Sequence, residues 1–97
     1  MKKIPRPSRL PSDILREDGW CKNRFQDDEG RCCLEGAFSK ALTGHGGNYI
    51  KVDGITGSIR RAIGTRGGIS SWNDAQEWVG PVIAAAERAE RLLGWRP

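Results

Sequence analysis

Three cysteines and one histidine are the soft metal ligands of this sequence, and the cysteines are also candidate nucleophiles. Cys21, Cys32 and Cys33 lie within residues 19–38, and His45 follows in a glycine-rich loop. Structural zinc sites usually separate two cysteines by two to four residues, so that both thiolates reach one ion. Adjacent cysteines in a strand instead point to opposite faces, and the C-x-x-C redox pattern is absent. We therefore predict no metal ligands, no cofactor, and thiols that fill a small core.

Acid–base catalysis needs carboxylates whose surroundings tune their protonation. The sequence has an acidic cluster of Asp27, Asp28 and Glu29, but the cluster lies in the polar tract QDDEG, where water surrounds it. We therefore predict no catalytic residues and a protein that is not an enzyme. The acidic cluster is better suited to contact a basic partner.

Arginine and glycine are mixed in RRAIGTRGG, residues 60–68, and this composition suits phosphate binding. Glycine-rich backbone can form an anion nest, and the guanidinium groups of Arg60, Arg61 and Arg66 would strengthen it. The P-loop pattern is absent, however, and the carbonyl end of a helix disfavours anions. The segment is therefore more typical of a helix end and loop, and the three arginines are candidate binding residues.

The excess positive charge of the chain is concentrated in its first ten residues. They contain no acidic side chain and four basic ones: Lys2, Lys3, Arg6 and Arg9. Acidic and basic residues are equal in number over the rest of the chain. Three prolines prevent a continuous helix, so we predict a flexible basic tail over residues 1–11. Such a tail can hold nucleic-acid phosphates, but the neutral remainder favours a tail that only adds solubility.

Four tryptophans are many for 97 residues. Trp20 and Trp72 lie at boundaries between predicted elements, where we expect them to anchor the core. Trp78 and Trp95 flank the last predicted helix, and we expect them to be partly exposed. Exposed tryptophan beside arginine is typical of protein interfaces, so Trp78 and Trp95 are candidate binding residues.

The elements that would position these residues form one small globular domain over residues 12–97. Helical spacing of apolar residues predicts a helix from Ser12 to just before Gly19, and a second within residues 33–43 that ends at Gly44. A third helix would end at Gly64, and a fourth would run from Pro81 to about Leu93. The segment YIKV, residues 49–52, predicts a short strand or an extended segment.

The cysteine-containing segment predicts a β-hairpin. Residues 20–25 and 31–34 would form its arms around the QDDEG turn, with Gly30 supplying a positive φ. A two-stranded ribbon needs a helix packed on it to be stable. The predicted fold class is therefore α+β, with a small β-hairpin packed against three or four short helices in a single domain.

Three short motifs are GWC at residues 19–21, CCLEGA at 32–37 and WND at 72–74. These motifs make the sequence resemble an uncharacterised family of small proteins from tailed phages, prophages and actinobacterial or proteobacterial genomes. The resemblance covers about residues 12–92. Members carry a Trp-Cys hairpin, a Cys-Leu-x-Gly-Ala helix start and a Trp-Asn-Asp turn. This sequence departs from them between Asp74 and Val82, where Trp78 and the Gly80–Pro81 pair replace a more ordinary polar turn.

The resemblance implies a phage or mobile-element context, in which small proteins often bind and disable a host or defence machine. Because the family has no established activity, no catalytic residue is carried over. The WND motif also has a purely structural interpretation. Asn73 and Asp74 would cap the next turn while Trp72 fills the core.

These observations favour a small non-enzymatic accessory protein of a phage or mobile element, an inhibitor-type binder of a host or defence protein. Its candidate binding residues are Arg60, Arg61, Arg66, Trp78 and Trp95. The alternative is a nucleic-acid-binding accessory protein that uses the basic tail with the three arginines. No run of about 18 apolar residues and no signal-peptide core is present, so we expect no membrane partner and a cytoplasmic location in the host cell. We expect a monomer or a small homo-oligomer.

Overall fold

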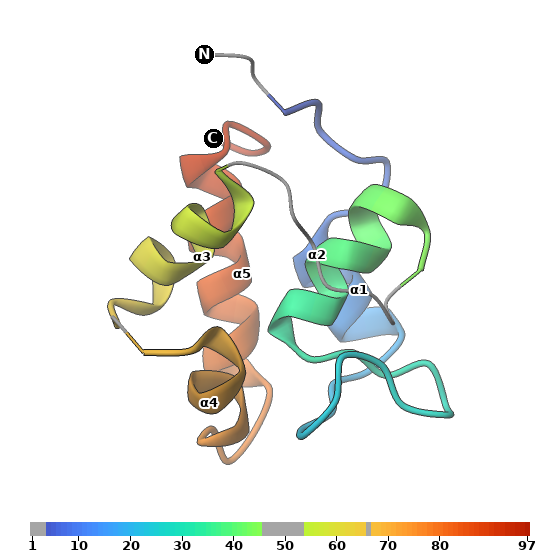
Figure 1. Ribbon diagram of the computed structural model, residues 1–97. Helices are drawn as coiled ribbons and strands as arrows, with labels where there is room; N and C mark the ends of the chain where they lie inside the picture. The colour runs from blue at the N-terminus through green and yellow to red at the C-terminus, as the bar shows by residue number, and fades with distance from the viewer. Residues whose placement is uncertain (1–3, 46–53, 66) are drawn as a thin grey trace.

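The computed structural model describes residues 4–45, 54–65 and 67–97. This part of the chain forms five helices: α1 (Pro11–Glu17), α2 (Leu34–Thr43), α3 (Ile55–Ile63), α4 (Ile69–Asp74) and α5 (Gly80–Leu92). α5 lies between the other helices and packs against α1 on one side and α3 on the other (Figure 1). α2 packs against α1 and α4, and α4 also packs against α3. None of the helices in these ranges is long and apolar enough to cross a lipid bilayer.

One hydrophobic core joins the five helices. Each helix contributes buried apolar side chains, among them Ile14, Phe38, Ile59, Ile69 and Val82. The C-terminal segment adds Trp95, whose ring stacks on that of Phe38 with 5.9 Å between the ring centroids. Trp95 is only 2% exposed. The prediction that Trp95 is partly exposed is therefore wrong, because the chain turns back after α5 and places the indole in the core.

The ends of three helices follow the sequence predictions. Gly44 and Gly64 end α2 and α3 in the left-handed conformation, with φ of 79° and 67°. A residue with a Cβ atom adopts this conformation only at a cost of about 1–2 kcal/mol. Pro81 lies in the first turn of α5, where a proline's missing N–H group breaks no helical hydrogen bond.

The predicted β-hairpin is absent, and residues 18–33 instead form an irregular loop, which we call the cysteine loop. Cys32 makes isolated bridges to Trp20 and to Gln26, but no strand pairing extends beyond them. Asn23 has a φ of 69°, which bends the first predicted arm and ends its extended conformation. The α+β prediction is therefore wrong, and the described residues form a helical fold. The strand predicted at residues 49–52 lies outside the described residues.

The start of α1 also differs from the prediction. The N-cap is Leu10, not Ser12, and its side chain makes no capping hydrogen bond. The N–H group and the hydroxyl of Ser12 instead donate to the two carboxylate oxygens of Glu90, at 2.8 and 2.9 Å. Glu90 is fully buried on α5, and Arg96 Nε lies 2.8 Å from its Oε1. A carboxylate from the last helix thus holds the start of the first.

Residues at both ends of the described part of the predicted tail take part in the core or pack against it. Leu10 and Pro11 are buried, and Ile4 packs against the core cluster. The indole nitrogen of Trp95 donates to the carbonyl of Ile4 at 3.0 Å. Ile4 therefore contacts the C-terminal segment of the chain.

Candidate functional site

Asn73 of α4 is fully buried and joins the three sequence motifs. Its Oδ1 accepts hydrogen bonds from Trp20 Nε1 at 2.8 Å and from the N–H group of Leu34 at 3.0 Å. Its Nδ2 donates to the carbonyl of Cys21 at 3.2 Å and to Asp74 Oδ1 at 3.0 Å. The prediction that Asn73 caps the following turn is wrong, because its amide instead fixes the cysteine loop to the start of α2. All four hydrogen-bonding positions of the amide are used, so Asn73 is not free to bind a ligand.

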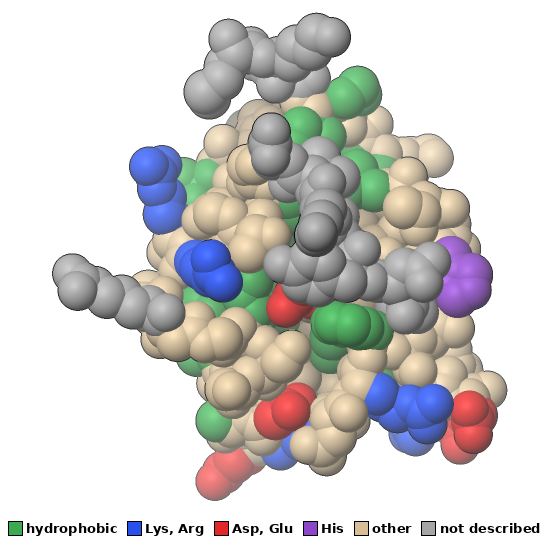
Figure 2. Space-filling view, in the orientation of Figure 1, with side chains coloured by type: hydrophobic (Ala, Val, Ile, Leu, Met, Phe, Trp, Pro, Cys, Tyr) green, Lys and Arg blue, Asp and Glu red, His purple; other side chains and the backbone are tan. Residues whose placement is uncertain are grey.

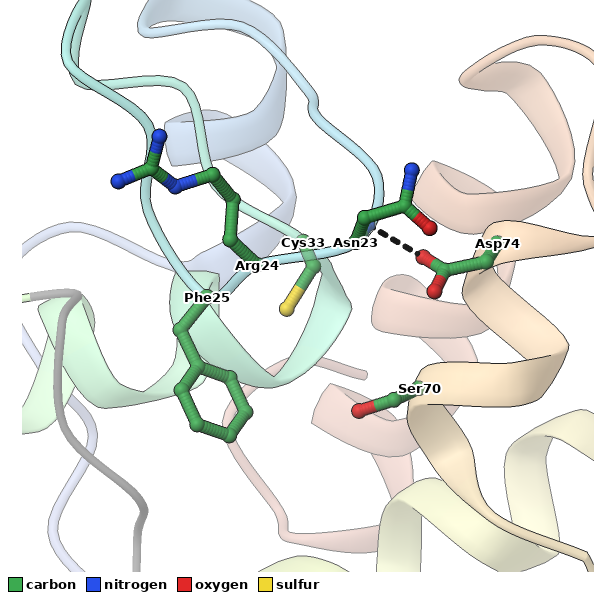
Figure 3. Close-up of a pocket in the computed structure, with 6 residues that line it drawn as sticks. All are labelled: Asn23, Arg24, Phe25, Cys33, Ser70 and Asp74. Carbon is green, nitrogen blue, oxygen red and sulfur yellow. Dashed lines mark hydrogen bonds between the residues drawn. The ribbon is translucent and has the colours of Figure 1, made fainter.

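A pocket opens beside this junction, and we call it the α4 pocket. Its cavity volume is about 190 Å³, and it is lined by Asn23, Arg24, Phe25, Cys33, Ser70 and Asp74. The cysteine loop supplies one wall and α4 the other (Figure 3). The Cys33 sulfur and the Ser70 hydroxyl point into the space between the walls, whereas the Arg24 side chain points away.

The thiols are poor nucleophiles. Cys33 Sγ accepts a hydrogen bond from the N–H group of Gly36 at 3.3 Å and so caps α2. Burial raises the pKa of Cys33 to about 12 and that of Cys32 to about 11, and it also raises the pKa of Cys21. The reactive thiolate is therefore scarce at neutral pH. Among the described residues, no three His, Cys, Asp or Glu side chains are placed to hold a metal ion.

Glu35 is a buried carboxyl group in the first turn of α2. Burial raises its pKa, while the charge of Arg60 and a hydrogen bond from Ser70 oppose the shift. Since the net shift is upward, the folded state disfavours the ionised carboxylate. The contribution of Glu35 to the free energy of unfolding therefore falls as the pH rises from below its unfolded-state pKa through its folded-state pKa.

We expect Glu35→Gln to raise Tm at pH 7, because the amide removes the cost of burying a charge and keeps the side-chain shape. The gain should vanish near pH 3, where the carboxyl is protonated in both folded and unfolded wild type. Thermal unfolding followed by circular dichroism from pH 3 to pH 8 measures the difference. Glu77→Gln is the control, since Glu77 is exposed. A lower Tm for Glu35→Gln at pH 7 would contradict the prediction.

The predicted binding residues do not form one cluster. Arg60 and Arg61 are exposed on α3, and Figure 2 shows basic side chains on this flank of the molecule. Arg9 lies beside α1 and pairs with Asp18 at 3.0 Å. Arg6 is exposed, whereas Lys2, Lys3 and Arg66 lie outside the described residues.

Trp78 is the predicted binding residue with the clearest surface position. It lies between α4 and α5 and is 66% exposed. Its ring lies against Gly80, and a Cβ atom at position 80 would overlap the ring atoms. Because Gly80 has no side chain, the exposed indole can pack directly against it.

Sequence reasoning missed the α4 pocket and the role of Asn73. The pocket joins residues 23–33 to residues 70–74, and nothing in the local spacing of either segment indicates this pairing. The sequence feature that points to this site is the polar pair Asn73–Asp74 directly after Trp72.

Comparison with known proteins assigns the chain to a family. No curated protein and no solved structure is significantly similar to the chain. A family model does match, and it covers residues 9–92, which include the cysteine loop, Asn73 and the α4 pocket. The chain therefore belongs to DUF6197, a family of unknown function.

Proposed function

We propose that this protein is a small non-enzymatic accessory protein of a phage or mobile element, which binds and inhibits a host or defence protein. Its contact surface would be centred on Trp78. The observation that carries the proposal is an exposed tryptophan that is held in place by its own chain. The phage context comes from the resemblance of the sequence motifs.

The packing of the Trp78 ring against Gly80 supports a binding role. Single exposed apolar residues are common, but Trp78 is 66% exposed while its ring packs against Gly80, a contact that limits the positions open to the indole. Binding through an ordered side chain loses less conformational entropy than binding through a mobile one. Tryptophan is also enriched among the residues that dominate interface energies.

The chemistry of the pocket is consistent with a protein that is not an enzyme. The sulfur on its wall belongs to Cys33, whose pKa of about 12 keeps it protonated at neutral pH. The buried amide of Asn73 is fully occupied by protein partners. Cys33 and Asn73 are therefore better suited to stabilising the fold than to catalysing a reaction.

The nucleic-acid alternative has weaker support in the described residues. Arg9 of the tail is paired with Asp18, which also pairs with Lys40 at 2.7 Å. Arg60 lies near Glu35, whose charge it offsets. Arg61 is exposed on α3 and remains a candidate phosphate contact.

We expect the immobilised protein to retain one stoichiometric protein from a lysate of the bacterium that carries the gene. Trp78→Ala should retain at least tenfold less of that protein, because it removes the central contact. Leu92→Ala is the matched control, since Leu92 is another large apolar residue that is 51% exposed. Mass spectrometry of the retained proteins measures the difference.

Two results would count against the proposal. Equal retention by Trp78→Ala and wild type would place the contact surface elsewhere. Retention that disappears after nuclease treatment and falls steeply with salt would favour the nucleic-acid alternative.

A further inference from the structure

The α4 pocket has the size of an amino-acid side chain. Pockets for drug-sized ligands and cofactors have volumes of about 300–1,000 Å³. The cavity here is about 190 Å³ and opens to the surface. A single side chain from a partner would fill a space of this size.

One carboxylate lies at the edge of this pocket. Asp74 Oδ1 accepts hydrogen bonds from the N–H group of Asn23 at 2.9 Å and from Asn73 Nδ2 at 3.0 Å. Oδ2 of the same carboxylate has no hydrogen-bond partner within the described residues. Figure 3 shows the carboxylate above the Ser70 hydroxyl, at the mouth of the space between the two walls. The free oxygen is thus available to a donor that enters the pocket.

The positive charges around the pocket are directed elsewhere. Arg24 lines the pocket, but its side chain points away from the interior and its Nη2 lies 3.6 Å from Asp28 (Figure 3). Arg60 on α3 interacts with Glu35, which Ser70 also contacts. The charge that faces the pocket is therefore negative.

The opposite wall is suited to a flat cation with an apolar stem. The Phe25 ring and the Cys33 sulfur line this wall (Figure 3). An arginine side chain has three methylene groups that pack on such surfaces, and its planar guanidinium stacks on aromatic rings. The guanidinium also has five N–H donors, enough for both Asp74 and the Ser70 hydroxyl. A lysine ammonium is more strongly hydrated and cannot stack in this way.

We propose that the α4 pocket receives an arginine side chain of the partner protein, with the guanidinium between the Asp74 carboxylate and the Phe25 ring. This inference rests on the proposed function and specifies the chemistry of the partner. Trp78 follows Asp74 by four residues, so their Cα atoms are at most about 14 Å apart. The pocket and the exposed indole can therefore belong to one contact surface, on which an arginine anchor lies beside an apolar contact.

The test uses the isolated protein and N-acetyl-arginine amide as the probe. Titration followed by two-dimensional amide NMR should give saturable shifts at Phe25, Ser70 and Asp74, with a Kd of about 1–10 mM. N-acetyl-citrulline amide has the same length without the charge and should bind at least tenfold more weakly. N-acetyl-lysine amide should bind at least threefold more weakly, because it cannot stack on Phe25.

Asp74→Asn should weaken arginine binding at least tenfold, since it keeps the acceptor oxygen and removes the charge. Glu77→Gln is the matched control on the same connection and should leave Kd unchanged. Phe25→Leu keeps an apolar wall and should reduce the preference for arginine over lysine. The amide spectrum of each variant reports whether its fold is intact.

The outcomes distinguish the arginine site from the proposed function. Equal binding of citrulline and arginine, shifts that map away from the pocket, or an unchanged Kd in Asp74→Asn would overturn the arginine site. These results do not depend on any partner being found. If arginine binds the pocket but no protein is retained from a lysate, the proposed function fails and the site stands.

Discussion

Asn73→Ala is expected to lower the free energy of unfolding by about 4 kcal/mol, a large share of the 5–15 kcal/mol typical of a small domain. The substitution leaves Trp20 Nε1, the N–H group of Leu34 and the carbonyl of Cys21 without their partner. Each unsatisfied buried group costs about 1–3 kcal/mol. Urea unfolding followed by tryptophan fluorescence and circular dichroism measures the loss.

A matched control separates the effect of losing the buried amide from the effect of removing an exposed asparagine. Asn23→Gly removes an exposed asparagine and suits the positive φ at that position, so its effect should stay within about 0.5 kcal/mol. A coupling test adds Trp20→Phe, which deletes the indole N–H group. Its cost should be smaller in the Asn73→Ala background, because the hydrogen bond is already lost. A loss below about 1 kcal/mol for Asn73→Ala would mean that water replaces the amide.

The convergence on Asn73 explains why the sequence motifs have no evident chemistry. GWC, CCLEGA and WND each supply one part of the junction: the indole and carbonyl of residues 20 and 21, the N–H group of Leu34, and the amide of Asn73. The motifs therefore act as one folding unit. They also build the wall of the α4 pocket, since Cys33 and Asp74 lie in two of them.

Local features of the sequence predicted where α2 and α3 end and where α5 begins, but they predicted the cysteine loop poorly. Glycine at 44 and 64 and proline at 81 act through the conformation of single residues, so they can be recognised without the fold. The hairpin prediction failed because alternation within residues 20–25 does not show the reversal at Asn23. The buried position of Trp95 was also missed, because it depends on the chain turning back toward Phe38 after α5.

The candidate site was less predictable than the helices. Asn73 contacts Trp20 and Leu34 across 53 and 39 residues, and Ser12 contacts Glu90 across 78. Such pairs depend on how the helices pack, and no local pattern reports them. Ser12 shows the limit clearly: it is a good N-cap residue, yet its hydroxyl is used by a carboxylate of the last helix.

Glu90→Ala is the second substitution with a large expected effect, a loss of about 3–5 kcal/mol in the free energy of unfolding. Glu90 is fully buried and accepts from both the N–H group and the hydroxyl of Ser12. The guanidinium of Arg96 supplies the opposite charge, with Nε 2.8 Å from Oε1. Removal of the carboxylate leaves that guanidinium and the start of α1 without their partner in the core.

Two further variants show which part of the loss comes from charge. Glu90→Gln keeps one acceptor oxygen and the side-chain volume, so it should cost less than alanine while still removing the buried charge opposite Arg96 Nε. Glu87→Gln is the control: Glu87 pairs with Arg16 and Arg96 nearer the surface, where such pairs contribute at most about 1 kcal/mol. Chemical unfolding of the three variants gives the order. If Glu90→Ala cost no more than Glu87→Gln, the buried carboxylate would not be what joins the first helix to the last.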